Sequence, residues 1–197
     1  MRPRLVALCA AVVTACSVIG DQEVLTDAQQ VIAAMKIGAL EPEGADLKIV
    51  GAVDHADRRY RVGEPVTLSV QVNKAAHVAV LRVMPNGATT LVFPNRLQTT
   101  ARVPADTVVR IPEPGAPLTI GADKPAVVLF EFIASSRGDS WLFNRKPPES
   151  TDFAELGTTT RALAKDIVSS LKVGHGSDTA AAHLAIRVRD DQPATYR

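Results

Sequence analysis

The stretch Pro65-Val66-Thr67-Leu68-Ser69-Val70-Gln71-Val72 decides the fold class of this 197-residue chain. Apolar and polar residues alternate along it, and a period of two is the pattern of a strand with one buried face. Its even positions, Val66, Leu68, Val70 and Val72, are therefore predicted to face a core, and its odd positions to face outward.

Further strand patterns lie on both sides of this stretch, at residues 47–52, 77–84, 88–93, 107–111, 126–134 and 182–188. Pro85-Asn86-Gly87 is predicted to join two of them as a hairpin, because Asn and Gly tolerate positive φ. The run at 127–133, apolar except for Glu131, suits a central strand covered on both faces. Roughly seven short strands that do not alternate with helices predict a mainly β chain, folded as an antiparallel β-sandwich.

Two helical patterns flank these strands. Thr26-Asp27-Ala28-Gln29 offers a capping box for a helix that ends near residue 37. Toward the C-terminus, apolar residues at spacings of three, seven and four form one stripe of an amphipathic helix. These residues are Phe153, Leu156, Leu163, Ile167 and Leu171. Gly157 could kink this helix or split it in two, and residues 137–150 before it are predicted to form an irregular loop.

The first sixteen residues have the pattern of a secretion signal. Arg2 and Arg4 precede an uncharged apolar run at 5–15, which is too short to span a bilayer. Val13-Thr14-Ala15-Cys16 then fits the cleavage pattern of bacterial lipoproteins, which predicts lipid attachment at Cys16. The alternative is cleavage by the ordinary signal peptidase near Ala15, which would leave Cys16 as a free thiol.

The residue after Cys16 is Ser17 and not Asp, which favours sorting to the outer membrane, with the domain facing the periplasm. The sequence thus divides into six segments. They are a signal peptide (1–15), a tether with the N-terminal helix (16–46), the β-sandwich core (47–136), the irregular loop (137–150), the C-terminal helix with the last strand (151–189) and a polar tail (190–197).

Composition excludes several classes of partner. Lys and Arg number 22 against 21 Asp and Glu, so the balance does not favour nucleic acid, and removal of Arg2 and Arg4 with the signal leaves the chain nearly neutral. Electrostatic membrane binding is therefore not expected from the overall charge, and the lipid would provide the anchor. Aromatic residues make up 4%, too few to favour an aromatic platform for bases or sugars.

Residue patterns for catalysis or metal binding are weak. The histidines His55, His77, His175 and His183 show no metal-ligand spacing, and two cysteines are too few for a zinc ribbon. Ser, His and Asp occur together at 174–178, but triad members converge from separate elements, and the chain has no G-x-S-x-G elbow. The sequence therefore predicts no enzyme, no cofactor and no metal site.

The loop at 137–146 holds the only Trp of the chain together with Phe and three cations. Trp and Arg are the residues that dominate protein interfaces, so Arg137, Trp141, Phe143 and Arg145 are candidate partner-binding residues. The alternative is that Trp141 and Phe143 fold back and cap one end of the sandwich.

Several motifs resemble one bacterial family. They are Tyr60-Arg61-Val62-Gly63-Glu64-Pro65-Val66-Thr67-Leu68, Pro85-Asn86-Gly87, Leu91-Val92-Phe93-Pro94-Asn95, Ile111-Pro112 and the apolar strand that ends at Ser135. In this order they resemble the domain of unknown function 4384, over residues 58–136. The strand before the Asn-Gly turn lacks the aromatic residue that the family often has there.

This resemblance implies a small β-sandwich module of secreted or envelope proteins with no established catalytic residues. The motif residues also have a structural explanation as strand ends and turns. Pro94 ends strand pairing after Phe93, and Asn95 can bond the backbone of the next turn. Gly63-Glu64 turns the chain into the strand that follows.

Together these features predict a non-enzymatic lipoprotein of the outer membrane that binds another envelope protein, as an accessory to a secretion or surface-assembly system. Two alternatives stay open: a periplasmic module that binds glycan or peptidoglycan and, less favoured, a hydrolase.

Overall fold

The computed structural model of the chain describes residues 46–157, 160–172 and 178–190. The predicted signal peptide, the lipidation site Cys16 and the helix predicted at 26–37 lie outside the described residues.

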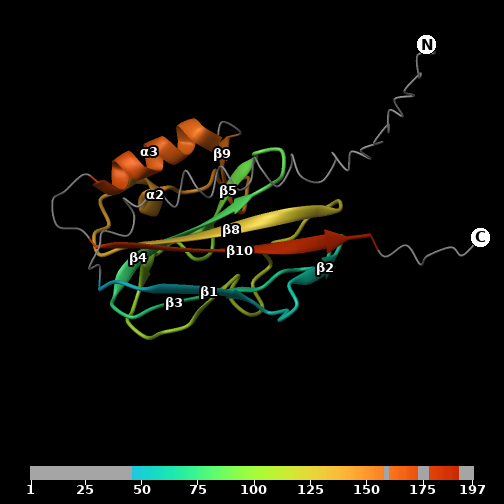
Figure 1. The fold of residues 1–197 in the computed structure, drawn as a ribbon, viewed down its shortest axis with the longest axis horizontal. Helices are drawn as coiled ribbons and strands as arrows, with labels where there is room; N and C mark the ends of the chain where they lie inside the picture. Colours follow the sequence, from blue (N-terminus) through green and yellow to red (C-terminus); the bar gives the residue numbers. More distant parts are fainter. Residues whose placement is uncertain (1–45, 158–159, 173–177, 191–197) are drawn as a thin grey trace, which may run out of the picture.

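Two β-sheets form the body of the domain (Figure 1). The smaller has the order β1 (Ile49–Val53), β3 (Leu68–Val72), β7 (Val109–Ile111). The larger has the order β2 (Arg59–Arg61), β10 (Thr179–Arg189), β8 (Ala126–Ser135), β4 (Ala76–Val83), β5 (Thr89–Phe93), β9 (Ala154–Gly157), and β6 (Arg102–Val103) pairs with β4 beside this path. All pairs are antiparallel except β2 and β10, which run parallel.

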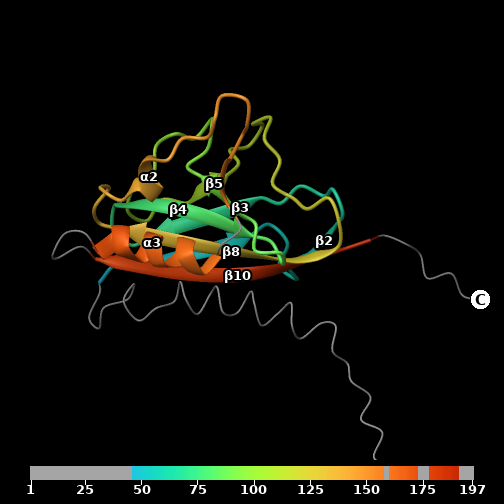
Figure 2. The same cartoon turned by 90° about the horizontal axis from the view of Figure 1, so that it is seen from above.

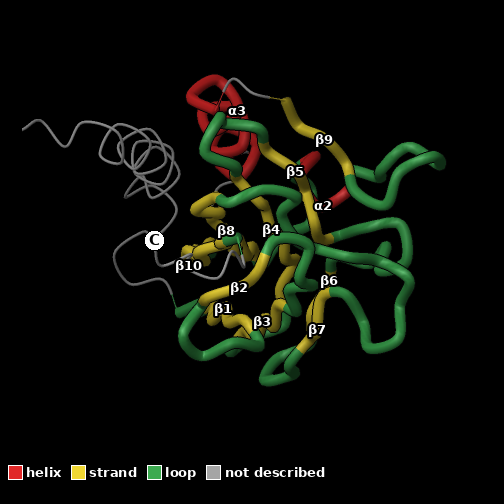
Figure 3. Tube along the Cα trace, turned by 90° about the vertical axis from the view of Figure 1, so that its right-hand side faces the viewer, coloured by secondary structure: helices red, strands yellow, loops and turns green. Residues whose placement is uncertain are grey.

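The larger hydrophobic core receives side chains from both sheets. Leu68 and Val70 of β3 share it with Phe130 and Phe132 of β8, and each of these four side chains is at most 1% exposed. The smaller sheet therefore covers one face of the larger sheet (Figure 3).

A second core lies on the opposite face of the larger sheet. There the helix α3 (Thr160–Lys172) and the short helix α2 (Trp141–Asn144) pack Ile167 and Leu142 against strand residues such as Leu81 and Ile133. Figures 1 and 2 show α3 over the end of the sheet that is remote from β2. Both faces of β8 and β4 are thus covered, which explains why β8 is apolar from residue 126 to residue 134 except at the buried Glu131.

The main sequence predictions are confirmed. The chain is mainly β, and Val66 and the even positions of β3 are buried while Ser69 and Gln71 point outward. β8 lies between β10 and β4, as a central strand should. Helix α3 lies between β9 and β10 in the chain and forms a layer on the larger sheet.

Two predictions about local structure are wrong. Residues 137–150 are not wholly irregular, because α2 begins after Ser140, whose Oγ accepts a hydrogen bond from the Leu142 amide at 3.3 Å. The stripe from Phe153 to Leu171 is not one helix: residues 154–157 form β9, and only the later residues lie in α3. Phe153 packs against the first core and Leu156 against the second, so their helical spacing is a coincidence.

Candidate binding cleft

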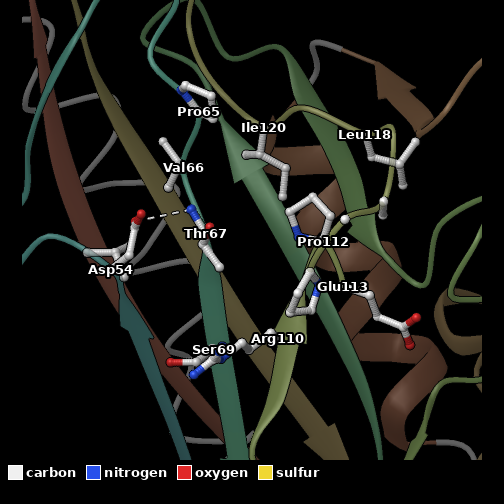
Figure 4. Close-up of a pocket in the computed structure, with 14 residues that line it drawn as sticks. Asp54, Pro65, Val66, Thr67, Ser69, Arg110, Pro112, Glu113, Leu118 and Ile120 are labelled. Carbon is white, nitrogen blue, oxygen red and sulfur yellow. Dashed lines mark hydrogen bonds between the residues drawn. The ribbon is translucent and has the colours of Figure 1, made fainter.

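An open cleft of about 560 Å³ lies on the smaller sheet, and we call it the β3–β7 cleft. It lies between the chain that leads into β3 and the loop that follows β7 (Figure 4). Its lining residues are Val53, Asp54, Pro65, Val66, Thr67, Ser69, Arg110, Pro112, Glu113, Pro114, Gly115, Ala116, Leu118 and Ile120. The loop after β7 has prolines at 112, 114 and 117, but no local pattern gives its position beside β3, so the cleft could not be read from the sequence.

The cleft combines apolar and polar lining residues. Val66, Leu118 and Ile120 form the buried apolar base of the cleft and are at most 6% exposed, whereas Thr67, Ser69, Arg110 and Glu113 supply hydroxyl and charged groups. Apolar pockets with a few polar groups are the usual form of ligand sites, because the apolar part gives affinity and the polar part orientation. Prolines at 112 and 114 restrict the adjoining loop, which lowers the entropy lost when a ligand binds.

Asp54 is the carboxylate whose geometry is fixed most firmly in the cleft. Its Oδ1 accepts hydrogen bonds from the Tyr60 hydroxyl at 2.6 Å and from the Thr67 amide at 3.1 Å. Burial by itself would raise the pKa of Asp54, but these hydrogen bonds outweigh burial and hold the pKa below its usual value. Asp54 is therefore an ionised acceptor that links β1, β2 and β3 beside the cleft.

The other residues of the first family motif block the outer edge of β2. Gly63 has φ +77° and reverses the chain direction after β2. The Glu64 carboxylate thereby accepts a hydrogen bond from the Arg61 amide at 2.7 Å. Nδ1 of His55 lies 2.9 Å from the Arg59 carbonyl oxygen, and its ring stacks on Tyr60 at 4.5 Å. Because backbone groups of this edge are already bonded to side chains, β2 is a poor site for the addition of a partner strand.

We expect His55, beside β2, and His77, in β4, to give opposite pH dependences of stability. The Arg59 carbonyl, followed by the carboxylates of Glu64, Asp54 and Asp57, raises the pKa of His55. Its stabilising contribution should be complete below the ordinary pKa of about 6.5 and be lost as pH rises through the raised value. His55→Gln should therefore lower Tm more at pH 5.5 than at pH 8.

His77→Gln is the matched comparison. Burial, helped by the charge of Arg102, lowers the pKa of His77, so its contribution should be present above pH 6.5 and be lost as pH falls through the lowered value. Tm profiles of both variants against pH test this, and parallel profiles would contradict the assignment.

The second and third family motifs form turns. Asn86 Oδ1 accepts the Ala88 amide at 3.1 Å, and Gly87 has φ +81°. Phe93 is 2% exposed at the end of β5, the peptide bond to Pro94 is cis, and Asn95 is 1% exposed. Asn95 bonds the backbone of the turn after it, as the sequence predicts.

The candidate partner-binding residues of the 137–146 loop are not all on the surface. Phe143 is 3% exposed in the second core, and Trp141 packs against that core. Arg137 forms an exposed ion pair with Asp139 at 3.1 Å, and Arg145 is exposed. The placement of the two aromatic side chains favours the capping alternative for them, whereas partner binding through Arg137 and Arg145 stays a prediction.

A second open cleft, of about 540 Å³, lies beside the β4–β5 hairpin. Its most buried charge is Arg82, which donates hydrogen bonds to the Gly121 carbonyl at 3.0 Å and to Thr90 Oγ1 at 3.2 Å. Because these groups hold the guanidinium, Arg82 joins the 121–125 loop to the larger sheet.

Neither a metal centre nor a membrane-spanning helix is found in the described part of the chain. Within residues 46–157, 160–172 and 178–190, His, Cys, Asp and Glu do not form a group of three that could hold a metal ion. None of the helices in these ranges is long and apolar enough to cross a bilayer.

The fold and the cleft define a class: a two-sheet, mainly antiparallel β domain with an open cleft on its smaller sheet. Residues 59–137 match the family described as Domain of unknown function (DUF4384), so this part of the chain is a domain similar to that family. The match extends from β2 to just beyond β8, which confirms the resemblance. No curated protein and no solved structure matches the chain.

Proposed function

We propose that this chain is a non-enzymatic envelope lipoprotein that binds a segment of another envelope protein in the β3–β7 cleft. It would act as an accessory to a secretion or surface-assembly system. The observation that carries the proposal is the cleft itself, because its buried apolar residues lie beside hydroxyl and charged groups that could bond a peptide backbone.

The alternative of a glycan-binding module is less well supported. The residues that line the β3–β7 cleft include no aromatic side chain, so a sugar ring would find no ring face to stack on. A hydrolase is also less well supported, because the lowered pKa of Asp54 makes this carboxyl a poor proton donor near neutral pH.

We also infer that the two sheets form a β-sandwich, since side chains of both share the larger core. Lipid on Cys16 would anchor this domain in the outer membrane, with the domain in the periplasm. The lipoprotein cleavage pattern at 13–16 and Ser17 support this part of the proposal.

The test is in-cell crosslinking of the native lipoprotein followed by mass spectrometry of the crosslinked species. Ser69 lines the cleft from the outward face of β3, so Ser69→Tyr should fill the cleft and leave the core intact. We expect this variant to reduce the crosslinked partner about tenfold.

Gln71→Tyr is the matched control, because Gln71 lies on the same face of β3, two residues farther, and does not line the cleft. It should keep the partner, and Cys16→Ala should reduce it by releasing the anchor. Equal loss in both tyrosine variants, or recovery of cell-wall material without a protein partner, would overturn the proposed function.

A further inference from the structure

The parallel pairing of β2 and β10 brings together four arginines that are far apart in the sequence. Arg187 lies opposite Arg59, and Arg189 lies opposite Arg61. Neighbouring strands are about 4.8 Å apart and alternate residues about 7 Å apart, so the four form a compact array. We call these four residues the arginine face.

All four point away from the larger core. Tyr60 and Val188, which lie between them on the two strands, are 3% exposed and belong to that core. Side chains alternate along a strand, so the arginines occupy the opposite face of the sheet, where all four are exposed. Figures 1 and 2 show that β2 lies at the opposite end of the sheet from α3.

Several carboxylates border this face, and Arg61 has an interaction partner of its own. Glu64 and Asp57 accept the amides of Arg61 and Arg59 at the edge of β2, and Asp190 follows β10. Exposed Arg58 adds another cation at the start of β2. Among the described residues, no ion pair forms with Arg59, Arg187 or Arg189. The arginine face therefore gathers four cations on one exposed surface of a chain whose overall composition is nearly neutral.

The shape and composition of the arginine face indicate the kind of partner. Neither of the two clefts described above includes residues of the arginine face. The exposed large apolar side chains of the described chain are Val50, Leu97 and Val108, and none lies on β2 or β10. Protein interfaces normally have an apolar centre, whereas attraction to a charged bilayer needs only clustered cations.

We propose that the arginine face binds the phosphate groups of an anionic lipid bilayer. Guanidinium groups form paired hydrogen bonds with phosphate oxygens, and an array of them can contact several headgroups at once. This inference rests on the proposed envelope anchor, which would hold the domain near a bilayer and raise its effective concentration there. It goes beyond the expectation from the overall charge, in which the lipid alone provides the anchor.

The test measures co-sedimentation with vesicles, using the mature chain (16–197) with Cys16→Ala so that neither an attached lipid nor the apolar signal segment contributes. One set of vesicles is pure phosphatidylcholine, and the other contains about 30% phosphatidylglycerol. We expect stronger binding to the anionic vesicles. Arg187→Gln combined with Arg189→Gln should lower that binding roughly 30-fold, because each cation near such a surface is worth about fivefold.

The matched control removes two positive charges at a distance. Arg145 and Lys146 directly follow α2 in the chain, and both are exposed. Figures 1 and 2 show α2 at the end of the domain away from β2. Arg145→Gln with Lys146→Gln should bind anionic vesicles nearly as well as the parent chain, and high salt should abolish binding.

Equal binding to both kinds of vesicle, or equal loss in the two double variants, would overturn the membrane proposal. An acidic protein crosslinked through the arginine face, without vesicle binding, would also overturn it. The cleft test is independent, since Ser69→Tyr should leave vesicle binding unchanged.

Discussion

Replacement of Asn95 by Ala should lower the free energy of unfolding by about 3 kcal/mol, because it removes a buried side chain that bonds in four directions. Asn95 Oδ1 accepts the amides of Leu97 at 3.0 Å and Gln98 at 2.8 Å, and its Nδ2 donates to the Val92 carbonyl and to Gln98 Oε1, each at 3.1 Å. Urea unfolding at neutral pH measures the change.

The loss should extend beyond the turn itself. Gln98 Nε2 donates to the Arg110 carbonyl at 2.8 Å, so Asn95 and Gln98 together connect the end of β5 to β7, whose residue Arg110 lines the β3–β7 cleft. Through these hydrogen bonds Asn95 and Gln98 help to fix the position of β7 beside the cleft. We expect Gln98→Ala to lower the free energy of unfolding by about half as much as Asn95→Ala, since the Gln98 side chain makes two of these hydrogen bonds and Asn95 makes four.

Asn95→Asp separates hydrogen bonding from packing. The carboxylate keeps the acceptor for the two amides but replaces the donor with charged oxygens that face the Val92 carbonyl and Gln98 Oε1. Its pKa should rise in the folded state, so its stability should approach that of the parent only as pH falls toward about 4. Gln71→Ala, which removes one exposed hydrogen bond to the Asp106 carbonyl, should change stability by less than about 0.5 kcal/mol. A similar small effect of Asn95→Ala would contradict the buried network.

The long strands could be predicted from sequence because their signals are local. Alternation in β3 and the apolar run of β8 follow directly from burial on one face and on both faces. β2 was not predicted, because it has three residues and two of them are arginines. Its pairing depends on β10, which lies more than a hundred residues later and outside the family match.

The cleft and the arginine face could not be predicted from local sequence patterns for the same reason, namely that their residues come together only in the folded chain. Asp54, Ser69, Arg110 and Ile120 line one cleft only after β1, β3 and β7 have paired. The motif residues could be assigned to turns, but the networks of Tyr60 and Asn95 depend on partners such as Asp54 and Gln98 in the folded chain. The alternating arginines at 59–61 and 187–189 were the available signal for the arginine face, although only the parallel register joins them.

Gly51 should be nearly irreplaceable, because the ring of Phe132 occupies the space that a β-carbon would need. A Cβ built on Gly51 would lie well inside van der Waals contact of that ring, at 2.6 Å from Cζ. Glycine in a strand normally costs stability relative to alanine, so Gly51→Ala would be favourable in the absence of this contact. We expect the steric clash with Phe132 to outweigh the gain in backbone entropy. Gly51→Ala should therefore destabilise the protein by about 2 kcal/mol as β1 moves away from β8.

A double-mutant cycle with Phe132→Leu tests the cause. Phe132 is 0% exposed, so the leucine variant alone should cost about 2 kcal/mol through the cavity that it leaves. In the combined variant the methyl group introduced by Gly51→Ala can use that space, and the total loss should be smaller than the sum of the single losses by about 1 kcal/mol or more.

Ala52→Val is the matched control for the glycine substitution. Ala52 is the next residue of β1, its side chain is exposed, and β-branched residues favour strands, so this variant should be neutral or slightly stabilising. Additive losses for Gly51→Ala and Phe132→Leu would show that the two residues do not compete for space. Non-additive losses would instead show that close approach of β1 to Phe132 holds the smaller sheet, and with it the β3–β7 cleft, against the larger sheet.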